Sequence, residues 1–176
     1  APNGKYIVID LGSMKDVSPL RNLSYEKVGY MVITHPHYDH FSDIENIGWA
    51  KPDVLWRVKN FSRTELMQGV SDAQKAAFKT YCNLSDTYNS ILTESEKPNS
   101  GIPFDGLVVE VYNIDYLDKS DKNNFSAVVI LQLGKAKVVV CGDNTIESLT
   151  ELMKNDNFKE KVKDSYVLVA PHHGRE

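Results

Sequence analysis

The stretch VGYMVITHPHYDH, residues 28–40, joins an apolar, β-branched run to a cluster of histidines and an aspartate. The apolar half has the character of a buried strand, and the polar residues follow where that strand would end. Imidazole and carboxylate groups are the side chains that bind Zn²⁺-like ions. His35, His37 and Asp39 alternate by two, so an extended backbone would direct them to one side, whereas His40 departs from the alternation. The stretch therefore predicts a loop that serves two adjacent metal ions.

Two further strand-like runs, VVVCGD at 138–143 and VLVAPHHG at 167–174, also end in metal-type side chains, and they contain the only other histidines. Open α/β sheets place ligands beyond the carboxyl ends of their strands, so we expect all three runs to converge on one metal site. The simpler interpretation is that Asp143 caps a helix and that the histidine pair lies on the surface. Successive strand residues face opposite ways, and we expect His172, which is nearer the strand than His173, to bind the metal.

The pattern His-x-His-x-Asp-His at 35–40 resembles the signature of the metallo-β-lactamase superfamily, and Tyr6–Gly12 resembles the strand that precedes it. The resemblance implies a mixed α/β fold, an αββα sandwich with a two-metal cleft along one edge. The resemblance spans Tyr6 to Gly174, and we expect a single domain over residues 1–176 that is incomplete at its C-terminus. It also implies that Asp10 supports the site without binding metal and that Asp143 bridges the two ions.

The segments Ser126–Leu133, Cys141–Asp143 and Pro171–Gly174 together are most similar to the hydrolase domain attached to bacterial competence DNA-uptake channels. The phosphorylcholine esterases of that branch look similar too. Most relatives have a further histidine between the signature and the bridging aspartate, and here Asn123-Asn124 stands in the matching place. Either asparagine could supply an oxygen ligand, or the pair could form an ordinary turn. Phe41-Ser42 replaces a glycine-containing turn that is usual in relatives.

The resemblance implies a site of two divalent ions, with Zn²⁺ the first expectation and Mn²⁺ or Fe²⁺ as alternatives. Asp39 and Asp143 are the expected catalytic residues. The complete set of expected metal ligands is His35, His37, Asp39, His40, Asp143 and His172. Such ions lower the pKa of a bound water toward about 7, and the resulting metal-bound hydroxide is the expected nucleophile.

These residues predict a metal-dependent hydrolase, and a two-metal clamp suits a phosphodiesterase or nuclease. The expected substrate is a phosphate ester, with single-stranded nucleic acid as one candidate. One alternative is hydrolysis of a lactone, thioester or β-lactam, and another is a non-catalytic metal-binding regulatory module of a larger assembly. The nearest basic cluster to the signature comprises Lys51, Arg57, Lys59 and Arg63, which would be either a solvated surface or a contact for an anionic substrate.

Composition fits one soluble domain: 176 residues, 41% hydrophobic and 25% charged, with a formal charge of −4. The chain is mildly acidic and has no dense basic tract, which weighs against a nuclease. It shows no membrane-length apolar stretch and no signal peptide, and Cys82 and Cys141 are too few for a disulfide framework, so we expect a cytoplasmic protein with reduced thiols. Because the chain opens at Ala1-Pro2 and stops soon after the histidine pair, we expect a processed or excised piece whose C-terminal segment is missing or comes from a partner domain.

The periodicity also predicts the regular elements. A helix should begin at Ser18-Pro19, and another should begin with a capping box at Ser71–Gln74 and bury Ala73, Ala76, Ala77, Phe78, Tyr81 and Leu84. A third should be capped by Asn144 and turn Ile146, Leu149, Leu152 and Met153 toward a sheet. Strands are expected at Tyr6–Asp10, Val28–Thr34, Asp53–Val58, Leu107–Tyr112, Ala127–Leu133, Ala136–Cys141 and Tyr166–Ala170, with loops at Glu94–Pro103 and Leu117–Asn124.

Overall fold

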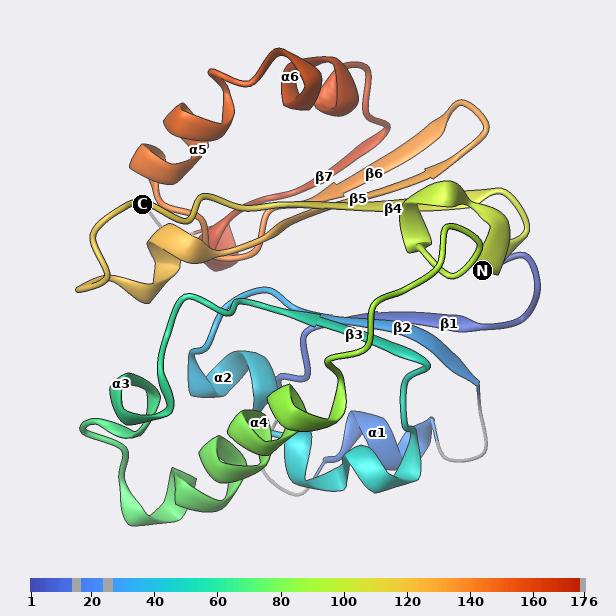
Figure 1. The fold of residues 1–176 in the computed structure, drawn as a ribbon. Coiled ribbons are helices and arrows are strands. Elements are labelled where there is room, and N and C mark those ends of the chain that lie inside the picture. Colours follow the sequence, from blue (N-terminus) through green and yellow to red (C-terminus); the bar gives the residue numbers. More distant parts are fainter. Residues whose placement is uncertain (14–16, 24–26, 175–176) are drawn as a thin grey trace. The chain divides into compact units, whose positions relative to one another are not determined.

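The apolar run before the histidine cluster forms β2 (Val28–Ile33), the middle strand of a parallel sheet (Figure 1). β1 (Tyr6–Ile9) and β3 (Val54–Arg57) flank it on either side. All 6 residues of β2 are buried, as expected for a central parallel strand with both hydrogen-bonding edges occupied. This computed structural model describes residues 1–13, 17–23 and 27–174.

The chain divides into two compact units, which we describe separately. Residues 4–91 form the N-terminal unit, and residues 1–3 with 92–176 form the C-terminal unit. The N-terminal unit contains the β1–β3 sheet, and Figure 1 shows α1, α2 and α4 on one face of that sheet. Its α-helices are α1 (Pro19–Asn22), α2 (Tyr38–Phe41), α3 (Arg63–Met67) and α4 (Lys75–Thr87), with 3-10 turns at Ile44–Trp49 and Asp72–Gln74.

Aromatic rings attach α2 to α4. Phe41 is fully buried, and its ring centroid lies 4.9 Å from that of Phe78 and 4.7 Å from that of Tyr81. Such ring pairs stabilise a core beyond their burial alone. The next residue, Ser42, accepts a hydrogen bond from the backbone N–H of Ser13 at 2.9 Å. The two residues that replace the usual glycine-containing turn thus anchor the histidine segment to the rest of this unit.

The C-terminal unit is built on a sheet with the order β4 (Leu107–Tyr112), β5 (Val128–Leu133), β6 (Ala136–Val140) and β7 (Val167–Val169). β5 pairs antiparallel with both β4 and β6, while β7 runs parallel to β6. Helices α5 (Ile146–Leu152) and α6 (Asp156–Val162) pack on this sheet, with 3-10 turns at Pro98–Ser100, Ile102–Phe104, Lys122–Phe125 and His172–Gly174. The core that joins them is Ile114, Val128, Ile130, Val139, Cys141, Leu152 and Phe158.

Two sheets flanked by helices confirm the predicted mixed α/β class. Each predicted strand is present, with ends within two residues of the expected ones. The helix start at Ser18 is also confirmed, since the Ser18 side chain accepts from the N–H of Arg21 and Pro19 is the first helical residue. The assignment of residues 1–176 to a single domain stays a prediction.

Two predicted helix starts are wrong. Ser71 precedes the separate 3-10 turn, and α4 begins only at Lys75, so Ala73 and Ala76 are exposed. The capping box of this region lies instead at Ser62 and Glu65, which begin α3 with reciprocal hydrogen bonds of 3.2 and 2.6 Å. Ala77, Phe78, Tyr81 and Leu84 are buried as predicted, because the later start leaves their spacing along the helix unchanged.

At α5 the cap is Thr145, whose hydroxyl accepts from the N–H of Ser148, and not Asn144 as predicted. Asn144 instead donates from its amide to the carbonyl of Cys141 at 2.6 Å. The displacement by one residue leaves Ile146 82% exposed and Met153 47% exposed. Of the residues expected to face the sheet, Leu149 and Leu152 are the ones that pack against the core.

The loop after β1 passes very close to α2. The N–H of Leu11 donates to the carbonyl of His40 at 2.7 Å, and a Cβ added to Gly12 would lie 2.5 Å from the carbonyl oxygen of Asp39. Real Cβ atoms do not approach backbone atoms so closely. Glycine is therefore required at this position for the loop and the histidine segment to meet.

Gly12→Ala should lower the free energy of unfolding by about 1–3 kcal/mol, because the added methyl group forces the two backbones apart. Urea unfolding followed by circular dichroism measures the change. Gly48→Ala is the matched control, since its added Cβ would meet no atom within 4 Å. Equal stability of the two variants would contradict the close approach.

Candidate metal centre

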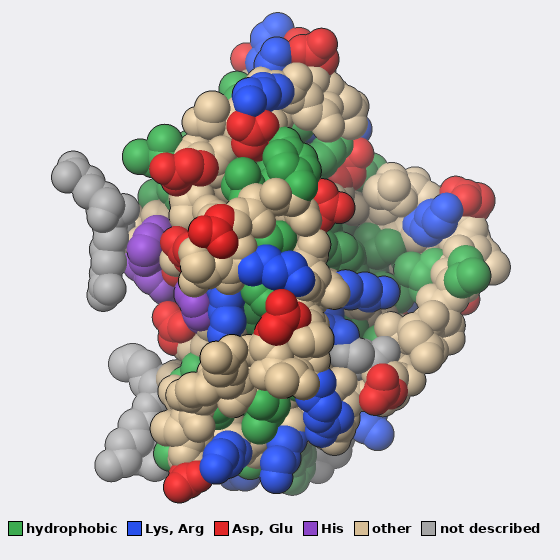
Figure 2. All heavy atoms as spheres, turned by 60° about the vertical axis from the view of Figure 1, so that its left-hand side comes forward, with side chains coloured by type: hydrophobic (Ala, Val, Ile, Leu, Met, Phe, Trp, Pro, Cys, Tyr) green, Lys and Arg blue, Asp and Glu red, His purple; other side chains and the backbone are tan. Residues whose placement is uncertain are grey.

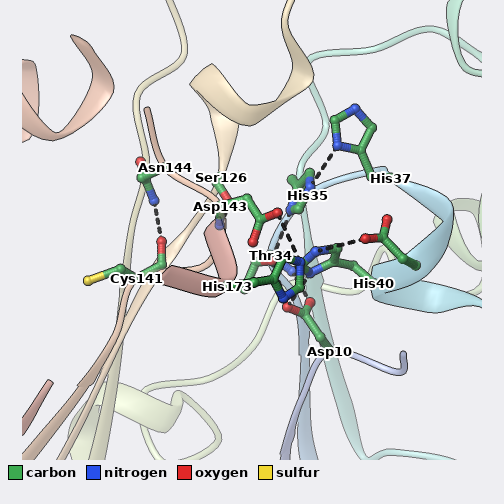
Figure 3. A network of polar contacts seen from close by, with 11 residues as sticks. Asp10, Thr34, His35, His37, His40, Ser126, Cys141, Asp143, Asn144 and His173 are labelled. Atoms are coloured by element: carbon green, nitrogen blue, oxygen red, sulfur yellow. Dashed lines mark hydrogen bonds and ion pairs between the residues drawn. The ribbon is translucent and has the colours of Figure 1, made fainter. Parts of the chain in front are cut away.

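Asp10, the residue directly after β1, organises the end of the β1–β3 sheet. Its Oδ1 accepts the backbone N–H of Thr34 at 2.7 Å, and its Oδ2 accepts the Thr34 hydroxyl at 2.8 Å. The same Oδ2 lies 2.8 Å from Nδ1 of His40. Figure 3 shows this carboxylate beneath the histidine segment. Asp10 thus contacts the end of β2 and helix α2, and its role in supporting a metal site stays a prediction.

These bonds determine which nitrogen of each ring carries the proton. A carboxylate only accepts, so Nδ1 of His40 must donate, and Nε2 of a neutral His40 then carries a lone pair. The Thr34 hydroxyl gives its proton to Asp10, so it accepts from Nδ1 of His35, which lies 3.2 Å away. His35 therefore also presents Nε2 as a lone pair. This is the form in which imidazole binds a metal, with its other nitrogen bonded to a supporting group.

The imidazoles of the signature lie against one another. Nε2 of His35 is 2.9 Å from Nδ1 of His37, and the ring centroids of His35 and His40 are 4.1 Å apart. His35 and His40 are both buried. Two imidazole nitrogens on one tetrahedral Zn²⁺ would lie about 3.3 Å apart, because each Zn–N bond is about 2.0–2.1 Å. The donor types, their tautomers and their spacing all fit a divalent metal ion.

Asp39 lies differently from what the alternation by two predicted. The backbone is extended at His37, which caps α2, and it becomes helical at Tyr38. The argument from an extended backbone is therefore wrong beyond His37. The Asp39 side chain is 67% exposed, and its Oδ2 lies 3.8 Å from Nε2 of His40. Asp39 thus places an exposed carboxylate near Nε2 of His40.

In the C-terminal unit the chain turns after β6 to place Asp143. Gly142 has a positive φ of 55°, and the N–H of Asp143 donates to the Ser126 hydroxyl at 2.9 Å. The Asp143 side chain is buried. Figure 3 shows Ser126 and Asn144 beside this turn. Ser126 belongs to one of the segments that resemble the competence-type hydrolase domain. No sequence pattern predicted that its hydroxyl would bond the backbone of Asp143.

The ring beside Asp143 is that of His173, whose Nε2 lies 3.4 Å from the Asp143 Oδ2. His172 donates its backbone N–H to the carbonyl of Gly142 at 3.0 Å. Both histidines have left-handed backbone, with φ of 50° and 55°, and Gly174 follows with 73°. The strand alternation that favoured His172 does not apply in such a turn. Half of the His173 side chain is exposed, and histidine side chains are visible at the surface in Figure 2.

The two asparagines before β5 differ in their bonding. Oδ1 of Asn124 accepts the Thr145 hydroxyl at 2.7 Å, and its amide donates to the carbonyl of Asp118 at 3.0 Å. Oδ1 of Asn123 is buried and has no hydrogen-bond partner in the described part of the chain. Burying such an oxygen without a partner costs free energy, so it calls for an explanation such as a bound ion.

The protein has a mixed α/β fold, and histidine and aspartate side chains follow the ends of its strands. The profile of the metallo-β-lactamase superfamily matches residues 1–172, and the chain belongs to that superfamily. Members are typically metallohydrolases, and the buried histidines and aspartate of this chain could bind metal. A comparison with curated proteins found no match. None of the helices formed by the described residues has the length and hydrophobicity of a transmembrane segment.

Asp10→Asn should lower the affinity for Zn²⁺ by about 10–100-fold, because the amide cannot serve both Thr34 and His40 as an acceptor. Asparagine tolerates the positive φ of 60° at this position, so the backbone should not change. Zinc retained against a competing chelator, measured by elemental analysis, tests this. The control is Asp53→Asn, which loses only the exposed pair with Lys5 at the other end of the sheet. Identical zinc retention by Asp10→Asn and wild type would disprove the supporting role.

Proposed function

We propose that this protein is a metal-dependent phosphodiesterase or nuclease. The observation that carries the proposal is the Asp10 carboxylate, which selects the metal-binding tautomer of two buried histidines. A carboxylate bonded to one ring nitrogen, with the other left as a lone pair, is the arrangement typical of metal-binding histidines. Membership of a superfamily of metallohydrolases supports the same class of activity.

We further propose that this protein binds a pair of divalent ions, as the family resemblance implies. The proposed ligands in the N-terminal unit are the signature residues, and those in the C-terminal unit are Asp143 and one of the two terminal histidines. The contact with Asp143 favours His173 over His172 for that place. Asn123, with its buried Oδ1, is the better candidate for the ligand that replaces the missing histidine, because Asn124 already uses its side chain. The full set is His35, His37, Asp39, His40, Asn123, Asp143 and His173.

Zn²⁺, Mn²⁺ or Fe²⁺ bound here would supply Lewis acidity and lower the pKa of water to about 7. The protein's own residues have other tasks. Asp10 fixes the ring protons of His40 and His35, and Ser126 fixes the Asp143 backbone. Asp39, exposed and close to His40, is placed to take up or deliver a proton. Burial raises the pKa of the Cys141 thiol, so this cysteine is a small core residue and not a nucleophile.

The choice of a phosphodiester rests on the segments that resemble the competence-type hydrolase domains and phosphorylcholine esterases. In those segments, Ser126 and Asp143 form one hydrogen-bonded unit. A neutral amide oxygen at Asn123 would take the place of the missing histidine. The metal centre would then be richer in oxygen ligands than the metal centres of superfamily branches that hydrolyse lactones or β-lactams. Single-stranded DNA or a nucleotide ester is the proposed substrate.

Bis-p-nitrophenyl phosphate should be hydrolysed in the presence of Zn²⁺ or Mn²⁺, whereas nitrocefin and a lactone should not. Asp143→Ala should reduce the rate to background because a proposed ligand of both ions is lost. Asp156→Ala, which removes an exposed carboxylate paired with Lys159 in the same unit, should retain the rate. Turnover only of nitrocefin or the lactone would instead support the second class of hydrolase. Bound metal without turnover of any substrate would support a regulatory module.

Two matched pairs of alanine variants test the ligand choices through bound zinc. His173→Ala should lose affinity by about tenfold or more, and His172→Ala should lose less, because the His173 ring is the one beside Asp143. Asn123→Ala should likewise retain less zinc than Asn124→Ala, whose lost bonds are to Thr145 and Asp118. Elemental analysis after dialysis gives both comparisons. The reverse order within either pair would assign the ligand to the other residue.

A further inference from the structure

A second polar feature lies at the end of the β1–β3 sheet that carries the histidine cluster. β3 ends at Arg57, which pairs with Ile33 in the parallel ladder, two residues before His35. With strands about 4.8 Å apart and a rise of about 3.3 Å per residue, the Cα atoms of Arg57 and His35 are roughly 8 Å apart. In Figure 1 the carboxyl end of β3, α2 and α3 lie at the same end of this sheet.

Arg57 lines a cavity of about 290 Å³ within the N-terminal unit. The cavity lies where β3, α3 and α4 meet. Its walls are Arg57, Phe61, Arg63, Leu66, Cys82 and Asp86. Two guanidinium groups against one carboxylate give it a net positive charge inside a chain whose formal charge is −4. A cavity of this size accommodates a phosphate group with a small apolar attachment.

Both guanidinium groups are held in place by other contacts. Nη1 of Arg57 donates to the carbonyl of Val58 at 3.1 Å, and its Cζ lies 5.1 Å from the ring centroid of Tyr81. Nη1 of Arg63 donates to Oδ1 of Asn83 at 3.1 Å. A guanidinium carries five N–H donors in a planar fork, and such a fork binds phosphate through two parallel hydrogen bonds. Groups already held in position lose little conformational entropy on binding.

The remaining walls are apolar. Phe61, Leu66 and Cys82 are all buried. Burial raises the pKa of the Cys82 thiol more than the neighbouring Arg63 and Arg57 lower it. The thiol is therefore neutral near pH 7 and serves as an apolar wall rather than a reactive group. An anion in this cavity would meet its charge partners in a partly dry environment, where they bind more strongly than on an open surface.

We propose that this cavity binds a phosphate group of the substrate next to the one that is cleaved. The position at the same sheet edge as His35 lets an extended phosphodiester place one phosphate at the metal centre and a neighbouring one between Arg57 and Arg63. This assignment rests on the proposed function in naming the substrate, whereas binding of phosphate by the cavity is independent of turnover. The cavity would explain how a chain without a dense basic tract recognises a polyanion.

Inorganic phosphate is titrated into the protein, which is kept metal-free with a chelator so that the cavity alone is tested. The arginine Nε–H signals in the NMR spectrum report binding. Arg63→Gln should raise the Kd at least about tenfold, since a hydrogen-bonded charge is lost. Lys59→Gln, an exposed lysine outside the cavity, should leave the Kd unchanged. Arg57→Lys should weaken binding severalfold, because it keeps the charge but removes the fork. An equal unfolding temperature for every variant shows that the fold is retained.

Wild-type-like phosphate binding by Arg63→Gln, or an equal loss in Lys59→Gln, would overturn the proposal. Acetate competing as well as phosphate, with the same dependence on Arg63, would also overturn the assignment to phosphate.

Kinetics separate this proposal from the proposed function. Arg63→Gln should raise the KM relative to wild type for a diester that has a second phosphate. This rise should be about tenfold larger than the rise for bis-p-nitrophenyl phosphate, which has one phosphate. An equal rise for both substrates would overturn the cavity's role in substrate binding. Phosphate binding that depends on Arg63, in a protein without any phosphodiesterase activity, would refute the proposed function and retain the anion site.

Discussion

The carboxylate of Asp10 is the group on which the N-terminal half of the candidate site depends. It accepts two hydrogen bonds from Thr34 at the end of β2 and one from His40 in α2, and hydrogen bonds to a charged group contribute about 1.5–3 kcal/mol each. Through Thr34 it acts on His35, and directly it acts on His40. One partly buried carboxylate thereby sets the ring orientation of two histidines that are neighbours in space but five positions apart in sequence. Gly12, two residues further, lets the same loop approach α2 closely enough for this contact.

Much of this arrangement follows from sequence pattern. Continuous apolar runs identify β2 and the first half of β5, because strand segments buried on both sides tolerate few polar residues. The donor residues stand out because they follow those runs directly. The resemblance of the signature to a known family supplied the role of Asp10, which alternation and charge alone would not reveal.

Other features depend on local backbone geometry that the residue types do not specify. The direction of Asp39 changed because α2 begins directly after His37. The helix starts near Ser71 and Asn144 were misplaced because several adjacent residues can cap a helix equally well, and tertiary packing selects one of them. His173 lies beside Asp143 because the chain there is left-handed, a conformation for which histidine gives only a weak signal.

The left-handed turn at His172–Gly174 has a consequence for how this end of the chain responds to ligands. A left-handed conformation costs roughly 1–2 kcal/mol for each residue with a side chain, and His172 and His173 both adopt it. Any cation held by His173 must repay that strain, so occupancy and ordering of the turn are thermodynamically linked. Under the ligand assignment proposed above, an ion bound by His173 would stabilise this turn, and removal of the ion would leave the turn less stable than the sheet.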